Sequence, residues 1–472
     1  MEYEVVIGLE VHIQLQTKTK LFCSCPAEFG EKPNTNICPV CLGFPGVLPV
    51  LNDNAVKLAL KAALALNCQI QNVSTFARKH YFYPDLPKGY QITQYERPLA
   101  VNGFLEIKNK KIRIRRLHLE EDAGKLIHTP NFTLIDFNRC GIPLIEVVTE
   151  PDLSNAEETV EFLSELRSIL RYLNVSSGDM EKGHLRCEPN ISLKVNGVWG
   201  KRREIKNLNS LKSVRDALNY EFITQKKILE AGRKIEQETL LWDEMEKVTK
   251  PMRSKEEAED YRYFPEPDLP PLVIKEEEVW EMKKGLPELP AEKRKRFVAN
   301  YHLSEKEAEI LVREREMADY FEEVIVAGKD SSPPFFRLAA SWLINEVARV
   351  INERNITVNQ FEISPQDLAQ LLILLREGRI TQRVAKDVFF RMVRERKKAQ
   401  EIIKEEGLEK AEDLSQLELV VKEVLRENPD VVASYKRGKE TVLMFLLGQV
   451  MKKTRGRFPP EKIREKILEN IR

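Results

Sequence analysis

The sequence predicts an α+β protein in which a mixed N-terminal region precedes an all-helical C-terminal region. Up to about residue 290, strand and helix patterns mix without a regular βαβ order, which argues against a doubly wound sheet. The proline-rich segment 261–272 cannot be helical, and Pro287 and Pro290 precede the first long predicted helix. After these prolines nearly every segment has helical periodicity.

Two elements of the N-terminal region have clear patterns. Residues 5–16 alternate with period two, which predicts a strand. Its apolar face consists of Leu9, Val11, Ile13 and Leu15, and its polar face of Glu10, His12, Gln14 and Gln16. Residues 154–173 predict an amphipathic helix, and Ser154 and Glu157 have the spacing of a capping box at its start.

The C-terminal region predicts helices near 304–327, 335–353, 365–377, 382–405, 413–427 and 439–454. Gly378 and Gly407 follow two of them at positions typical of C-caps. We therefore expect three domains, covering residues 1–290, 291–407 and 408–472.

Composition limits the class of protein. The chain has 472 residues, 32 % of them charged, and a net charge of +1, so any nucleic-acid binding must depend on local basic patches. No stretch approaches the roughly 18 apolar residues of a membrane span, and the N-terminus does not resemble a signal peptide. The seven cysteines are not arranged as a disulfide framework, so we expect a cytoplasmic protein.

Four cysteines form two close pairs, Cys23-x-Cys25 and Cys38-x-x-Cys41, separated by twelve residues. Four thiolates suit a closed, tetrahedral Zn²⁺ site with no open position for catalysis. The knuckle at residues 23–41 is therefore predicted to hold a structural zinc ion. Unliganded thiols and a redox pair formed by Cys38 and Cys41 are the alternatives.

Several acidic residues occur where burial would be costly. Glu146 lies in the apolar run 143–148, so its carboxylate needs a cation or hydrogen-bond donors. Glu10 and His12 project from the polar face of the first strand. A cleft formed by these three residues would suit Mg²⁺ and a bound phosphate, while a salt bridge to an arginine is the simpler alternative.

Basic residues are concentrated late in the chain. Between residues 376 and 400 nine Lys and Arg face three Asp and Glu, and between 429 and 472 eleven face five, a net of +6 in each segment. Such stripes on helices suit a phosphate backbone, although a solvated helix face would have the same composition. No P-loop motif is present, so any ATP site must be of another type.

Several segments of the N-terminal 290 residues, in order, resemble the B subunit of the aspartyl/glutamyl-tRNA amidotransferase family (the bacterial GatB type within the GatB/GatE family). These segments are 6–12 (VIGLEVH), 78–84 (RKHYFYP), 117–125 (LHLEEDAGK), 136–146 (DFNRCGIPLIE), 150–152 (EPD), 204–210 (EIKNLNS) and 260–268 (DYRYFPEPD). The helical C-terminal layout is similar too. The resemblance implies a cradle domain with a core akin to glutamine synthetase and guanidino kinases, followed by a helical domain and a YqeY-like tail that binds tRNA.

The resemblance also implies a reaction and partners. The family's B subunit uses ATP and Mg²⁺ to phosphorylate the side chain of Glu on tRNA-Gln, or of Asp on tRNA-Asn. Ammonia that the amidase, the family's A subunit, releases from glutamine then gives the amide, in a heterotrimer with a small C subunit. We accordingly expect a carbon–nitrogen ligase that binds neither membranes nor DNA.

The family's site positions map onto individual residues. Metal positions correspond to Glu10, His12, Glu121, Glu146 and Glu188, and positions near the reacting phosphate to Lys79 and Tyr81. Further expectations are Lys206, Asn207, Asn209 and Ser210 for ATP or substrate, and Lys436, Arg437, Lys439, Lys452, Lys453, Arg455 and Arg457 for tRNA. Glu188 stands where the family usually has Asp, so its longer arm could change the coordination.

Strand alternation and the family resemblance disagree about which glutamate, Glu120 or Glu121, faces the cleft. Strand alternation at 117–121 would direct His118 and Glu120 into the cleft, whereas the resemblance points to Glu121. We follow the resemblance and expect a β-bulge that turns Glu121 inward. The alternative functions are a non-catalytic tRNA-binding scaffold, which would not need a buried carboxylate cluster, and a zinc-dependent RNA-binding module.

Overall fold

The computed structural model of the chain describes residues 3–108, 110–254, 261–408 and 414–471. Residue 260 of the segment 260–268, and residues 409–413 and 472 of the predicted tail, therefore lie outside the described residues. The chain divides into two compact units, Met1–Pro290 and Ala291–Arg472. The first unit combines strands and helices and the second is helical, as the predicted fold class requires.

A ten-stranded sheet forms the centre of the first unit, in the order β15-β14-β13-β11-β1-β10-β7-β6-β2, with β12 paired to β11. All of its pairings are antiparallel except that of β13 with β14. The strands are β1 (Tyr3–Gln14), β2 (Gln69–Ile70), β6 (Ala100–Ile107), β7 (Lys110–Glu121), β10 (Pro143–Thr149), β11 (Leu185–Val195), β12 (Val198–Trp199), β13 (Arg203–Lys206), β14 (Glu238–Asp243) and β15 (Val248–Ser254).

The alternation predicted for the first strand is confirmed. Leu9, Val11 and Ile13 are at most 1 % exposed and belong to the main core, while Glu10 and His12 on the opposite face are partly exposed. The apolar face of the sheet packs against helices α1 (Asp53–Ala65), α2 (Ala156–Tyr172) and α3 (Leu211–Glu230). A further helix, α4 (Glu276–Lys284), ends this unit.

The start of α2 differs from the prediction by one residue. Asn155 is the N-cap, and its side chain accepts a hydrogen bond from the backbone N–H of Glu158. The Glu158 carboxylate in turn accepts from the backbone N–H of Ser154. The predicted box of Ser154 and Glu157 was wrong because Ser and Asn cap helices about equally well, so spacing cannot separate the adjacent candidates Ser154 and Asn155.

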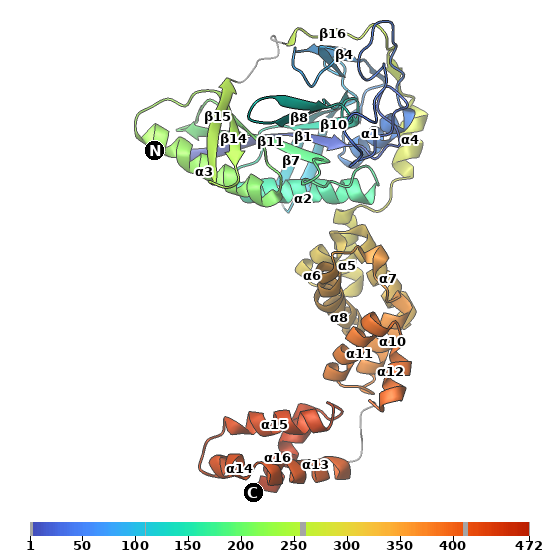
Figure 1. The fold of residues 1–472 in the computed structure, drawn as a ribbon, viewed down its shortest axis with the longest axis vertical. Helices are drawn as coiled ribbons and strands as arrows, with labels where there is room; N and C mark the ends of the chain where they lie inside the picture. The colour runs from blue at the N-terminus through green and yellow to red at the C-terminus, as the bar shows by residue number, and fades with distance from the viewer. Residues whose placement is uncertain (1–2, 109, 255–260, 409–413, 472) are drawn as a thin grey trace. The chain divides into compact units, whose positions relative to one another are not determined.

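Three small sheets complete the first unit. Figure 1 shows β4 and β16 on one side of the ten-stranded sheet and α2 and α3 on the other. These sheets pair β16 (Phe264–Pro265), β4 (Ala77–His80) and β5 (Tyr90–Thr93); β17 (Leu272–Val273) and β3 (Val73–Ser74); and β8 (Lys125–His128) and β9 (Thr133–Asp136). The proline-rich segment is thus extended as predicted, and it contributes β16 and β17.

The second unit consists of short helices. They are α5 (Pro290–Tyr301), α6 (Glu305–Val312), α7 (Arg315–Gly328), α8 (Pro333–Trp342), the π-helix Leu343–Val347, α9 (Ala348–Arg354), the 3₁₀ turn Val358–Gln360, α10 (Pro365–Arg376), α11 (Gln382–Glu395), α12 (Ala399–Glu406), α13 (Leu414–Glu427), α14 (Pro429–Lys436), α15 (Val442–Lys453) and α16 (Pro460–Ile471). Their buried apolar residues form one cluster from Phe297 to Leu408 and another from Leu417 to Ile471.

Two predicted helices of this unit are each split into two. The segment 304–327 breaks at Glu314, which is extended, and 382–405 breaks at Arg396, which has a left-handed φ of 56°. Neither position carries the Gly or Pro that would signal an interruption. Gly407 does cap α12 with a φ of 58°, as predicted, and Gly378 has a φ of 70° immediately after α10.

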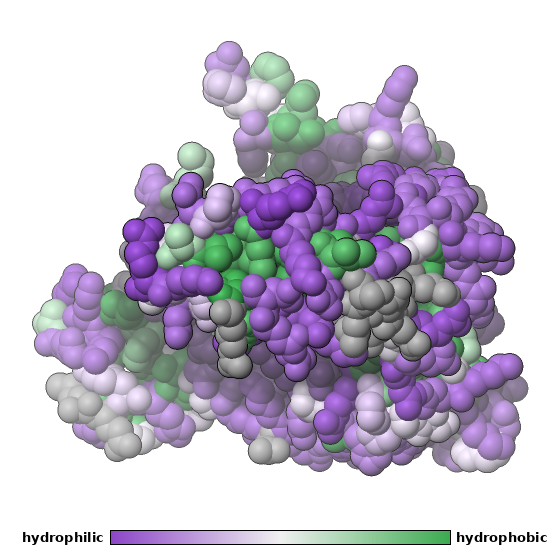
Figure 2. All heavy atoms as spheres, turned by 90° about the horizontal axis from the view of Figure 1, so that it is seen from below, coloured by the Kyte–Doolittle hydropathy of each residue, from purple (hydrophilic) through white to green (hydrophobic). Residues whose placement is uncertain are grey.

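The exposed surface reflects the charged composition. Hydrophilic side chains cover most of the face drawn in Figure 2, and apolar areas on it are small. Among the described residues no helix has both the length and the apolar character that crossing a bilayer requires.

Candidate active site

Polar side chains from many strands of the first unit line a cleft of about 1010 Å³. Its walls come from the ten-stranded sheet, from β4 and β5, and from Tyr261 and Tyr263 of the proline-rich segment. Because side chains alternate along a strand, the face opposite the core presents every second residue to this cleft. Glu10, His12 and Glu146 all line it, as the sequence predicted.

His12, Glu120 and Glu146 form the first of two potential metal-binding sets in the cleft. Each offers one ligand atom, and these atoms lie within 4.8 Å of one another. The set depends on strand register, since His12 of β1 is directly opposite Glu146 of β10. His12 Nε2 lies 3.4 Å from Glu120 Oε1.

His118 contacts Glu146 of this set. Its Nε2 lies 3.0 Å from Glu146 Oε2, and its side chain is only 3 % exposed. Burial would raise the pKa of Glu146, but the charge and hydrogen bond of His118, with His12 and Lys79, hold that pKa well below its usual range. Glu146 is therefore a carboxylate at neutral pH and can act as a metal ligand.

Glu10, Glu188 and Glu204 form the second set, again with ligand atoms within 4.8 Å of one another. Here an ammonium group is already in place, because Lys206 Nζ pairs with Glu188 and lies 3.6 Å from Glu204. Burial would raise the pKa of Glu188, but Lys206, with His12, lowers it to about 2. Four of the five residues that the resemblance assigned to metal binding are thus divided between two sets.

Lys79 and Tyr81 line the same cleft as the first set. Lys79 Nζ lies 4.6 Å from the ring centroid of Tyr261. Burial would lower the pKa of Lys79, but Tyr263, Glu120, Tyr261 and Glu146 together raise it. Lys79 is therefore a cation near the carboxylates. Burial raises the pKa of Tyr81 to about 12.

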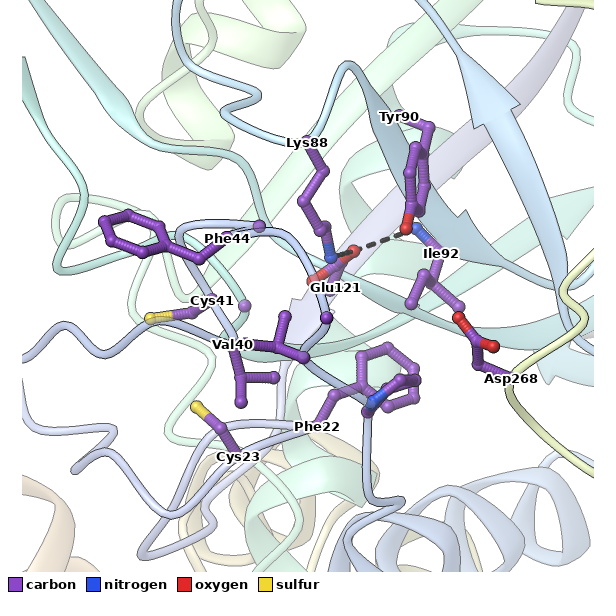
Figure 3. A pocket seen from close by; sticks show the side chains of 15 residues that line it. Phe22, Cys23, Val40, Cys41, Phe44, Lys88, Tyr90, Ile92, Glu121 and Asp268 are labelled. Atoms are coloured by element: carbon purple, nitrogen blue, oxygen red, sulfur yellow. Dashed lines mark hydrogen bonds and ion pairs between the residues drawn. The ribbon is translucent and has the colours of Figure 1, made fainter.

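Glu121 does not enter this cleft, so the expectation that it joins Glu10 and His12 is wrong. The register of β7 against β10 runs without interruption from Leu117 to Glu121, and the expected bulge is not there. Figure 3 shows Glu121 in a second pocket, facing Lys88. Its Oε1 also accepts a hydrogen bond from the backbone N–H of Ile92, at 2.9 Å. Simple alternation was correct, and Glu120 takes the position in the cleft.

Three of the four weaker ATP or substrate candidates lie outside the cleft. The Asn207 amide donates to the Trp242 carbonyl, Ser210 is the N-cap of α3, and Asn209 is exposed outside the lining. These residues form the connection from β13 to α3, so their polar side chains satisfy a turn and a helix start. Lys206 alone of the four lines the cleft.

The Sγ atoms of Cys23, Cys25, Cys38 and Cys41 lie within 4.8 Å of one another, and all four cysteines are free thiols. Cys38 and Cys41, whose redox pairing was the alternative to a zinc site, are not joined by a disulfide in the structure. Tetrahedral zinc with bonds of about 2.3 Å separates its sulfurs by roughly 3.8 Å, and Cys41 Sγ lies 3.9 Å from Cys38 Sγ. The donor set thus fits Zn²⁺.

A buried lysine adjoins the cysteines. Lys20 has no exposed surface, and its Nζ lies 3.6 Å from Cys41 Sγ and 3.3 Å from the Phe137 carbonyl. The hydrogen bond with Cys23, helped by the charge of Lys20, lowers the pKa of the Cys41 thiol to about 4. At neutral pH this sulfur is a thiolate, the form that binds metal.

The basic residues predicted to bind tRNA gather near the ends of two helices. Lys436, Arg437 and Lys439 are exposed around the end of α14. Lys452 and Lys453 end α15, but Lys453 is paired with Glu423 at 2.8 Å and with Glu427 at 2.6 Å. Arg455 is exposed and Arg457 half-buried just beyond that helix.

Several residues of the cleft were not predicted. Besides Glu204, they include Asn190, which donates a hydrogen bond to Glu10 at 3.1 Å, and Arg186, which pairs with Asp122 at 3.1 Å. The signal that could have found them is the same alternation, because Arg186, Glu188 and Asn190 are every second residue of β11.

Comparison with known proteins gives matches over both units. The model of the GatB/GatE catalytic domain matches residues 5–280, and that of the GatB domain matches residues 319–471. A protein of Carboxydothermus hydrogenoformans is 49 % identical over 481 residues, covering 100 % of this chain and 99 % of its own length. One of Thermotoga petrophila is 50 % identical over 488 residues, covering 99 % and 100 %. Both relatives are described as the B subunit of aspartyl/glutamyl-tRNA(Asn/Gln) amidotransferase.

Proposed function

The chain belongs to the family of aspartyl/glutamyl-tRNA(Asn/Gln) amidotransferase B subunits, and from that membership we propose that it activates the substrate carboxylate with ATP. The substrate is Glu attached to tRNA-Gln, Asp attached to tRNA-Asn, or both. The product is the corresponding Gln-tRNA or Asn-tRNA. The chain acts in the cytoplasm, in a heterotrimer with the amidase, which is the A subunit, and with a small C subunit.

The observation that supports this function is the arrangement of His12, Glu120 and Glu146 together with Lys79 in one cleft. Forming an acyl phosphate brings a carboxylate together with the phosphates of ATP, so a catalyst must offset several negative charges. A cation-binding set near a lysine serves that need. A site that only positions tRNA does not need carboxylates buried on a sheet.

The reaction has two bond exchanges. A side-chain oxygen of the substrate attacks the γ-phosphorus of ATP, the bond from that phosphorus to the β,γ-bridging oxygen breaks, and ADP leaves. Ammonia then attacks the carbonyl carbon of the acyl phosphate, the carbon–oxygen bond to phosphate breaks, and nitrogen loses a proton. Lys79 would offset the charge that develops in the first exchange, and Tyr81 lines the same cleft.

The first set is the better candidate for Mg²⁺. Two carboxylates and an imidazole would hold the ion, which would neutralise phosphate charge during transfer. The set of Glu10, Glu188 and Glu204 is already neutralised in part by Lys206, so we assign it to positioning Glu10 beside the first set. The lack of a P-loop and the position of this site on a sheet agree with a core akin to glutamine synthetase and guanidino kinases.

The cysteines have a separate role. Cys23, Cys25, Cys38 and Cys41 would hold a structural Zn²⁺ that stabilises the knuckle and takes no part in either bond exchange. The tail would add tRNA affinity through its exposed lysines and arginines.

ATP hydrolysis by the assembled complex tests this proposal. We expect hydrolysis that depends on Glu-tRNA-Gln or Asp-tRNA-Asn and that His12→Ala or Glu146→Ala abolishes. Glutamine hydrolysis by the amidase, measured where it is uncoupled, is the control and should survive. Near-normal ATP turnover in both variants would support the scaffold function instead.

A further inference from the structure

β7 has a bulge, but it lies at Arg115 and not at the carboxylates. Val148 of β10 is opposite Arg116 while Thr149 is opposite Ile114, so Arg115 is an extra residue on β7. Bulges re-aim side chains and often lie beside active sites. Here the bulge directs two consecutive arginines, Arg115 and Arg116, to the cleft, where a regular strand would present only one.

The two arginines have different surroundings. Arg115 is 61 % exposed and is held by Glu150, through Nε to Oε1 at 2.9 Å and Nη2 to Oε2 at 3.0 Å. Arg116 is half-buried, and its Nε is a buried donor without a hydrogen-bond partner. Within the described chain it also forms no salt bridge. Since Arg loses no proton at neutral pH, this is a charged group with one buried donor, Nε, that lacks a hydrogen-bond acceptor.

Other cations of the cleft are mostly neutralised. Arg186 pairs with Asp122, Lys206 with Glu188, and Lys201 with Glu236 at 3.8 Å. Of the described cations that line the cleft, Lys79, Arg116 and Arg202 have no carboxylate within salt-bridge distance, and Arg202 is exposed before β13. Lys79 and Arg116 both act on Tyr263, where burial raises the pKa and these two cations oppose that rise.

Lys79, Arg116 and Tyr263 line the same cleft as the first carboxylate set. On β7, Arg116 is two residues from His118 and four from Glu120 on the same face, and His118 contacts Glu146 at 3.0 Å. Two cations without a salt bridge, in a cleft that also holds a metal-binding set, suit an anion with several oxygens. Such an anion would also fill the empty Nε donor of Arg116.

We propose that Arg116 binds the phosphoryl group that passes from ATP to the substrate carboxylate. This inference rests on the proposed function. The phosphoryl oxygens stay negatively charged at the site through both bond exchanges. In the loose transition state of the first exchange that charge is spread over three oxygens, so a guanidinium fork placed on them lowers the barrier. A fork on the substrate carboxylate would instead hold the attacking oxygen and weaken it as a nucleophile.

The test compares Arg116→Met with Arg115→Met in the assembled complex. Arg115 is the matched control because it shares the bulge and its charge is already balanced by Glu150. For Arg116→Met we expect kcat for tRNA-dependent ATP hydrolysis to fall at least about 100-fold. The preference for binding Mg-ATP over Mg-ADP should fall about 10-fold, and KM for the aminoacylated tRNA should stay within roughly twofold. Arg115→Met should remain within about threefold of wild type in all three.

Each other outcome has a definite meaning. Equal effects of the two variants would overturn the inference, and so would a raised KM for tRNA with unchanged ATP affinity, which would assign Arg116 to the substrate carboxylate. If Arg116→Met does not fold, Arg116→Lys decides: a loss of about tenfold in kcat at unchanged melting temperature supports the fork, and no loss overturns it. Wild-type complex without tRNA-dependent ATP hydrolysis would refute the proposed function itself.

Discussion

The cysteine knuckle and the carboxylate cleft both bring metal-binding side chains together, but the chain builds them in different ways. The knuckle uses four residues within 23–41, and their Sγ atoms lie within 4.8 Å of one another. The cleft uses single residues from β1, β7, β10 and β11, which are far apart in the sequence and meet only through strand register. The knuckle residues are therefore close together in the sequence, whereas the cleft residues come together only when the sheet forms.

This difference predicts that neighbouring residues of β7 have unequal effects. Glu120→Gln should reduce tRNA-dependent ATP turnover by roughly 100-fold or more, because a ligand facing the phosphates is lost. Glu121→Gln leaves Lys88 buried without its carboxylate, so it should cost about 3–5 kcal/mol of stability. Turnover per folded molecule in that variant should stay closer to wild type. Steady-state kinetics and melting curves of both variants measure these effects. A larger loss of turnover in Glu121→Gln than in Glu120→Gln would indicate that Glu121, not Glu120, is the site residue.

Removing cysteines from the knuckle should lower the stability of the chain and leave catalysis nearly unchanged. Cys38→Ser with Cys41→Ser should lower the melting temperature by at least about 5 °C while kcat of the remaining folded complex changes little. Native mass spectrometry should find one zinc ion per chain. After chelation the four knuckle thiols should become accessible and react, whereas Cys68 and Cys187 should stay protected because both lie in the main core of the first unit. A chain without zinc after expression in ample metal would contradict the assignment.

Truncation after Leu408 tests the role of the tail. Leu408 is kept because it packs in the apolar cluster that begins at Phe297. The first unit should stay folded, and KM for aminoacylated tRNA should rise more than kcat falls.

Replacing Lys436, Arg437 and Lys439 by Ala should reduce the slope of log K against log salt by about 2. Lys453→Ala is the control, since two glutamates already balance its charge. Equal affinities and slopes for full-length and truncated chains would show that the tail does not bind tRNA.

The smallest expected effect concerns the start of α2. Asn155→Ala should cost about 1 kcal/mol and speed hydrogen exchange at Glu158, because the backbone N–H of Glu158 donates to the Asn155 side chain. Ser154→Ala should cost less, because its Oγ accepts only from Lys110 at the surface. Equal exchange in the two variants would mean that the cap is not local to Asn155.

The sequence predicted the cysteines of the knuckle and several residues of the cleft, but not how strand register divides the cleft residues between two sets. Spacing identified the cysteines, and alternation identified the face of β1 that carries Glu10 and His12. Alternation also identified Glu120, and the resemblance to a family overrode it with a bulge that lies instead at Arg115. The breaks at Glu314 and Arg396 had no sequence signal, because ordinary residues adopt these conformations when the packing of adjacent helices requires it.

The fully buried Lys20 has a consequence for the order of events while the chain is being synthesised. Its ammonium group needs negative charge beside it before it can leave water. Cys41, 21 residues later, supplies the sulfur, but the carbonyl of Phe137 comes 117 residues later. At about 5–20 residues per second, the ribosome takes on the order of ten seconds to reach Phe137. All four cysteines are present once Cys41 has been made, 96 residues before Phe137. That remaining interval gives a nascent chain time to capture its metal before the core closes over Lys20.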